Sequence, residues 1–103
     1  MKRIYSAAIW YKDLPTAQYL PTNIKHGIVV EGHRHADIIR TVLNLTGKRS
    51  VSNAPDGVGE TVQGFVTNDN EFVNRVEAMK IARAAGQLIA ETNSNKLYSE
   101  DIY

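Results

Sequence analysis

The chain has 103 residues, of which 43% are hydrophobic and 22% charged, and this composition argues against global disorder. Its formal net charge of +1 argues against the strongly basic face that duplex nucleic acid requires. The absence of cysteine excludes disulfides and thiolate metal sites, and no apolar run approaches the ~20 residues of a membrane span. We therefore expect a single domain over residues 1–103, without a membrane partner, in the cytoplasm.

The first half of the chain predicts two strands and a helix. Residues 3–11 are rich in aromatic and β-branched side chains, which favour a strand. Residues 28–30 are a short β-branched run and predict a central strand. From about His35 to Leu45, apolar residues recur near a 3.6-residue period, and Gly47 then supplies a helix stop.

The second half predicts a hairpin and a second helix. The polar residues 48–60 predict a loop that could act as a flexible flap. Two strands follow at 61–66 and 71–73, and Asn74 then begins a helix with Glu77 in the capping-box position. This order predicts an α+β fold, a small antiparallel or mixed sheet packed by two main helices. The segment 97–103 carries large apolar side chains and is expected to dock onto the domain.

The turn Gly32-His33-Arg34-His35 is the first candidate site, because ligands often bind between a strand and the helix that follows it. Helix N-termini favour anions, and the Arg34 guanidinium suits phosphate oxygens. His33 and His35 could also contact phosphate, bind a metal ion, or serve as general acid and base. In the alternative, one histidine packs in the core and the other is solvated.

A second candidate site follows along the hairpin, and consists of Phe65, Asn68, Asp69, Asn70, Phe72, Asn74 and Arg75. Side-chain amides can read the edge of a base, and an aromatic ring can stack on it. The alternative is structural, with turn-forming residues, a helix cap at Asn74 and Phe72 in the core. Arg75 opposes the helix dipole and needs a compensating group, such as Glu71, Asp101 or a ligand phosphate.

Two further features suggest binding. Trp10 and Tyr11 face opposite sides of the predicted strand, so one of them is available for stacking or for an interface. Lys25, His26 and Gly27 form a small basic turn that could collect anions around an axis of subunits. No nucleophile elbow, Walker loop or dinucleotide fingerprint is present.

The order of several motifs resembles the small phage-encoded anti-Thoeris sponge proteins of the first type. The motifs are Gly32-His33-Arg34-His35, Gln63-Gly64-Phe65-Val66-Thr67, Phe72-Val73-Asn74-Arg75-Val76-Glu77-Ala78, Ile81-Ala82, Ala85-Gly86-Gln87 and the segment 97–103. The resemblance implies sequestration of glycocyclic ADP-ribose signals without catalysis or a cofactor, in the cytoplasm of the infected bacterial host. It also implies a homo-oligomer, from a dimer to a trimer of dimers, and binding of cyclic trinucleotides near the threefold axis.

Carried onto this chain, the resemblance makes Arg34 and Arg75 contacts to the diphosphate. Phe65 or Trp10 would stack on the base, and Asn70 or Asn74 would read its polar edge. His33 and His35 are further candidate ligand-binding residues. Lys25, His26 and Gly27 would form the second, axial site. Near the C-terminus this chain offers only Lys96 where the type is expected to carry an arginine. The alternatives are a small phosphoesterase or cyclic-nucleotide hydrolase that uses the two histidines, and a phage inhibitor that binds a host protein.

Overall fold

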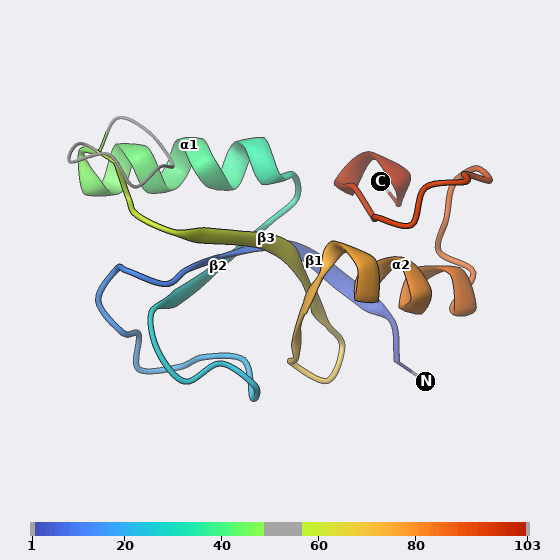
Figure 1. Cartoon of the computed structure of the whole chain (residues 1–103), viewed down its shortest axis with the longest axis horizontal. Helices are drawn as coiled ribbons and strands as arrows, with labels where there is room; N and C mark the ends of the chain where they lie inside the picture. The colour runs from blue at the N-terminus through green and yellow to red at the C-terminus, as the bar shows by residue number, and fades with distance from the viewer. Residues whose placement is uncertain (1, 49–56, 103) are drawn as a thin grey trace.

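A computed structural model describes residues 2–48 and 57–102. Its elements are β1 (Ile4–Tyr11), β2 (Ile28–Gly32), α1 (His35–Thr46), β3 (Thr61–Thr67), β4 (Phe72–Asn74), α2 (Arg75–Ala84) and a 3-10 turn η1 (Ser99–Asp101) (Figure 1). The strands form an antiparallel sheet of order β2-β1-β3-β4, so residues 28–30 belong to an edge strand, and the expectation of a central strand there is wrong. The predicted α+β fold is confirmed, and the sheet is antiparallel. The predicted flap lies largely outside the described residues, because 49–56 fall there.

The two faces of the sheet have different coverings. Both helices contribute to one core, in which Ile38, Val42 and Met79 pack with Ile9 and Phe65 of the sheet. The opposite face holds a smaller cluster, covered by the connection of residues 12–27, which lies on the other side of the sheet from α1 (Figure 1). Alternation along the strands therefore assigns each side chain to the helix-covered face or to the opposite face.

Local sequence signals fix the helix ends. The side-chain oxygen of Asn74 accepts a hydrogen bond from the backbone N–H of Glu77 at 2.8 Å, which confirms Asn74 as the N-cap of α2. Gly47 ends α1 in the left-handed conformation, with φ of 72°, and its N–H donates to the Leu43 carbonyl at 3.0 Å. Arg34 is the N-cap of α1 but makes no side-chain capping bond, so its guanidinium is available to other groups.

One irregularity interrupts β1. Ile4 pairs with Thr67 and Ser6 pairs with Val66, so Tyr5 is an extra residue in a β-bulge. The side-chain amide of Gln87 lies beside this point, accepting from the Ile4 N–H at 2.7 Å and donating to the Ile4 carbonyl at 2.8 Å. Gln87 thereby satisfies both backbone polar groups of Ile4, as a neighbouring strand would.

Candidate functional site

The starts of the two helices converge on the C-terminal segment. Arg34 precedes α1 and Arg75 begins α2, and both lie against the segment that contains Tyr98 and Glu100. We call these four residues the arginine cluster. The segment is anchored by Leu97, which is fully buried in the main core. The expectation that this segment docks is confirmed for the part that the structure describes.

Arg75 is the more enclosed of the two arginines. Its Nη1 donates to the Leu97 carbonyl at 2.7 Å, its Nη2 donates to Oε1 of Gln63, and its Cζ lies 4.5 Å from the centre of the Tyr98 ring. Burial lowers the pKa of Arg75, and the negative charges of the C-terminal segment act in the opposite direction. The C-terminal segment thus supplies the group that compensates an arginine in the first turn of a helix.

Arg34 is the more accessible arginine. Its Nη1 lies 3.3 Å from Oε1 of Glu100, and the side chains are 33% and 69% exposed, respectively. Among the described residues, the side-chain contact of the Arg34 guanidinium is this ion pair with Glu100. His33, on the same turn, is exposed. The cluster therefore presents the Arg34 guanidinium to solvent, with the Glu100 carboxylate against it.

His35 and Phe65 lie beneath the cluster as part of the interior. The Nε2 of His35 lies 2.7 Å from the Gly64 carbonyl oxygen, and its ring meets the Phe65 ring edge-on at 5.1 Å. Burial lowers the pKa of His35. Phe65 has no exposed surface, which corrects the expectation that it offers a face for stacking: α1 and α2 cover the side of β3 from which it projects. His35 is likewise a buried packing residue rather than a surface group.

Trp10 lies on the opposite face of the sheet from Phe65, so one chain does not bring the two proposed stacking residues together. Its Nε1 donates to the His26 carbonyl at 2.9 Å, and the ammonium of Lys12 lies 4.8 Å from the centre of its ring. Gly27 has φ of 76°, and an added Cβ would lie 2.4 Å from the Tyr11 carbonyl oxygen. Trp10 and the basic turn at residues 25–27 thus form a separate group, in which Lys25 and His26 are exposed.

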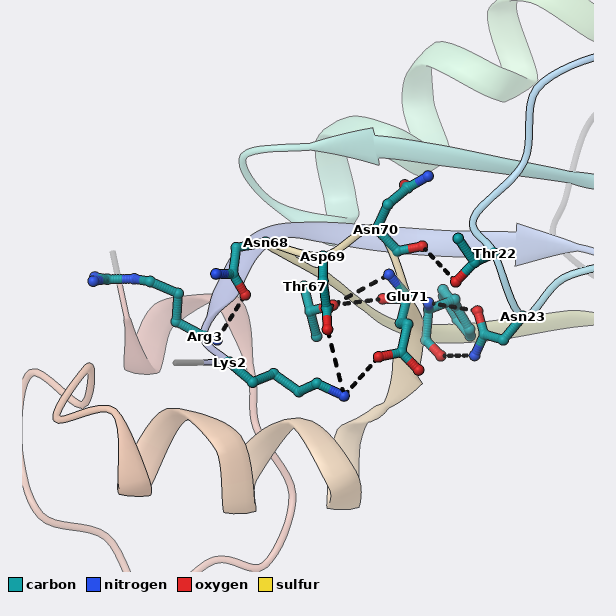
Figure 2. A network of polar contacts seen from close by, with 10 residues as sticks. Lys2, Arg3, Thr22, Asn23, Thr67, Asn68, Asp69, Asn70 and Glu71 are labelled. Carbon is teal, nitrogen blue, oxygen red and sulfur yellow. Dashed lines mark hydrogen bonds and ion pairs between the residues drawn. The ribbon is translucent and has the colours of Figure 1, made fainter.

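The two asparagines occupy different places. Asn74 caps α2, so its side-chain oxygen is already in use. Asn70 lies on the β3–β4 turn with φ of 62°, within a network of polar contacts around Lys2 and Glu71 (Figure 2). Its side chain turns away from that network, whereas its carbonyl oxygen faces Thr22 (Figure 2).

Sequence reasoning missed Tyr98 and Glu100 of the arginine cluster, and it missed Gln63, which accepts a hydrogen bond from Arg75. The alternation of apolar and acidic residues in the C-terminal segment was the available signal, since Arg75 needed a partner at the start of its helix. Among the described residues, no group of three or more His, Cys, Asp or Glu side chains could hold a metal ion. In the same part of the chain, no helix is long and apolar enough to cross a membrane.

Comparison with known proteins identifies a family whose model matches this chain. The model of a family described as phage T4 y16D protein matches residues 3–103, which is almost the whole chain. Neither the curated proteins nor the solved structures give a significant match.

Proposed function

The chain belongs to the phage T4 y16D protein family, and from this premise we propose that it is a phage-encoded sponge that binds cyclic ADP-ribose isomers without catalysis. The observation that supports this most is the convergence of Arg34 and Arg75 beside the half-exposed ring of Tyr98. Two guanidinium groups match the charge of a nucleotide diphosphate, and an adjacent aromatic ring offers a stacking surface for its base.

The ion pair between Arg34 and Glu100 suggests how the ligand enters. An exposed ion pair of this kind contributes only about 0–1 kcal/mol to stability. A diphosphate carries more charge and more acceptor oxygens than one carboxylate, and it can replace Glu100 at little cost. In this proposal Arg34 is the principal phosphate contact. Arg75, the more enclosed arginine, adds positive electrostatic potential at the same place, and Tyr98 takes the stacking role that was expected of Phe65.

Binding is favoured over hydrolysis by the placement of His35. Both of its ring nitrogens face partners, the Gly64 carbonyl at 2.7 Å and the Ser99 hydroxyl at 3.4 Å, and the residue is buried. A general acid or base must reach the proton that it transfers, and this imidazole is enclosed by protein. The His33–His35 pair is therefore a weaker basis for a function than the arginine cluster.

A second subunit would complete the pocket. Trp10 and the turn at residues 25–27 lie apart from the arginine cluster, on the opposite face of the sheet. In a dimer or a trimer of dimers, they could approach the cluster of a neighbouring subunit or form a second anion site around an axis, where cyclic trinucleotides would bind. The assembly would act in the cytoplasm of the infected host.

A ligand-release experiment tests this proposal. The full chain is incubated with glycocyclic ADP-ribose, separated from free ligand and heated, and the released nucleotide is analysed by chromatography. Recovery of intact ligand supports the sponge. Recovery of a cleaved product supports the hydrolase instead, and recovery of no nucleotide favours an inhibitor that binds a host protein.

Matched arginine variants locate the binding. Arg34→Ala should abolish retention of the ligand, whereas Arg40→Ala, an exposed arginine on the same helix, should leave retention unchanged. Equal retention by both variants would remove Arg34 from the site.

A further inference from the structure

The sheet face that turns away from the helices carries a hollow that lies apart from the arginine cluster. It has a volume of about 180 Å³ and is lined by Tyr5, Glu31, Val66, Thr67, Asn68 and Asn70. Tyr5 is 70% exposed, and within the described residues its hydroxyl makes no hydrogen bond. None of these side chains belongs to the arginine cluster.

The bulge in β1 creates this surface. Side chains alternate between the faces of a regular strand, so an extra residue changes which neighbours share a face. Ile4 packs in the helix-covered core, and the next residue that does so is Ala7. The side chains of Tyr5 and Ser6, which lie between them, both project from the opposite face of the sheet. There Tyr5 lines the hollow and Ser6 contacts Glu31.

Glu31 is held in place but not neutralised. The hydroxyl of Ser6 donates to its Oε1 at 2.6 Å, which orients the carboxylate on the edge strand β2. In the part of the chain that the structure describes, Glu31 forms no ion pair. An ionised carboxylate accepts hydrogen bonds only, so this position selects a ligand that presents N–H donors.

Asn70 supplies the opposite wall with both a donor and an acceptor. Its backbone is fixed, because its N–H donates to the Thr67 carbonyl at 3.0 Å and its own carbonyl accepts from the Thr22 N–H at 2.9 Å. The turn is further tied by Lys2, whose ammonium lies 2.6 Å from the carboxylate of Glu71 (Figure 2). The side-chain amide, turned out of this network, makes no hydrogen bond with the described residues.

We propose that this hollow binds a guanine base. The Tyr5 ring stacks on the base, Glu31 accepts from the two adjacent N–H groups of its Watson–Crick edge, and the Asn70 amide donates to its carbonyl oxygen. Adenine and uracil place a ring or carbonyl acceptor beside their donor, and that acceptor would face the carboxylate of Glu31. The lining contains no cation, so the base rather than the phosphate is recognised.

Nucleotide titrations of the full chain, followed by NMR, test the site. GMP should saturate the resonances of Tyr5 and Asn70, with an affinity about ten-fold or more above that of AMP. IMP, which lacks the exocyclic amine, should bind more weakly than GMP, and guanosine should bind as tightly as GMP. Equal affinities for GMP and AMP, or no saturable binding of GMP, would overturn the proposal.

Variants assign the roles and separate this site from the sponge site. Glu31→Gln should remove the preference for GMP over AMP, and Tyr5→Ala should weaken both, whereas Tyr19→Ala, at an exposed tyrosine outside the lining, should change neither. Thermal unfolding checks that these exposed substitutions leave the fold intact. Arg34→Ala should not alter GMP binding, so the two proposals fail independently. If N-acetylarginine amide binds at Tyr5 more tightly than GMP, the hollow takes an arginine side chain and the guanine assignment is wrong.

Discussion

The imidazole of His35 and the hydroxyl of Ser99 face one another in the protein interior, with Nδ1 and Oγ 3.4 Å apart. Both residues are buried, and they come from the start of α1 and from η1. Because the Nε2 of His35 also meets the Gly64 carbonyl, the ring links β3 to the C-terminal segment. The segment that carries Tyr98 and Glu100 is therefore positioned from within the core.

This burial predicts a pH-dependent stability. Burial lowers the pKa of His35 below its ordinary value of 6.5 and nearby Arg75 lowers it further, while the Gly64 hydrogen bond and Glu100 oppose the shift. Between the lowered pKa and 6.5, the unfolded chain binds more protons than the folded chain. The free energy of unfolding contributed by His35 should therefore rise with pH through this interval and level off above it.

Urea denaturation across this pH range measures the effect. His35→Gln should flatten the dependence, whereas His26→Gln on an exposed turn should preserve it. An unchanged slope in the His35→Gln variant would show that other groups cause the pH dependence.

Arg75→Lys should loosen the C-terminal segment. The planar guanidinium of Arg75 donates to the Leu97 carbonyl and to Gln63 at the same time, and a lysine ammonium cannot reproduce this geometry. Lysine also stacks less well on the Tyr98 ring. We expect a loss of about 1–3 kcal/mol in the free energy of unfolding. The hydrogen-exchange rate of the Leu97 amide should increase by more than the loss of global stability alone would produce. Arg83→Lys, at an exposed arginine bonded to the Thr92 carbonyl, is the matched control and should leave that amide protected.

Glu100→Gln should strengthen ligand binding. The substitution removes the carboxylate that competes with a diphosphate for Arg34, and we expect a several-fold lower dissociation constant by calorimetry. Stability should change by less than about 0.5 kcal/mol, since the pair is exposed. Glu91→Gln, at another exposed acidic residue, serves as the control. Weaker binding in the Glu100→Gln variant would mean that Glu100 contacts the ligand instead of competing with it.

Tyr11→Phe should stabilise the protein. The Tyr11 hydroxyl is buried without a hydrogen-bond partner in the described residues, and burial raises its pKa to about 12. Removing a buried unsatisfied hydroxyl should increase stability by about 1 kcal/mol, or roughly 4–8 °C in the melting temperature. Tyr19→Phe, at an exposed tyrosine, should leave the melting temperature unchanged. A lower melting temperature for Tyr11→Phe would indicate that the hydroxyl has a partner after all.

Local patterns were sufficient to predict the helices and strands. The β-branched run at residues 28–30 lies within β2, and Asn74 with Glu77 marks the start of α2, because propensity and capping act over a few neighbouring residues. The β1 bulge escaped prediction, since one additional residue leaves no mark in composition or periodicity. It nevertheless decides which face Tyr5 occupies.

The candidate site was predicted only in part, because its contacts join distant segments. Arg34 and Arg75 were identified from their chemistry and their positions at helix starts. Their partners belong to the C-terminal segment, and the contact between His35 and Ser99 spans 64 positions. Phe65 or Trp10 was expected to stack because an aromatic ring can stack on a base, but an aromatic residue in a strand can face either side of the sheet. Only the packing of α1 and α2 determines which side of β3 is covered.

The amide of Gln87 that completes the hydrogen bonding of Ile4 has a consequence for folding kinetics. The two residues are separated by 83 positions, and β1 also takes β2 and β3 as neighbours from further along the chain. Most of the polypeptide must be ordered before the backbone polar groups of the central strand are all hydrogen-bonded. The chain therefore loses loop-closure entropy before the contacts that offset this loss have formed. The domain should fold more slowly than a helical bundle of equal length, and its first strand should be among the last elements to gain full protection from exchange.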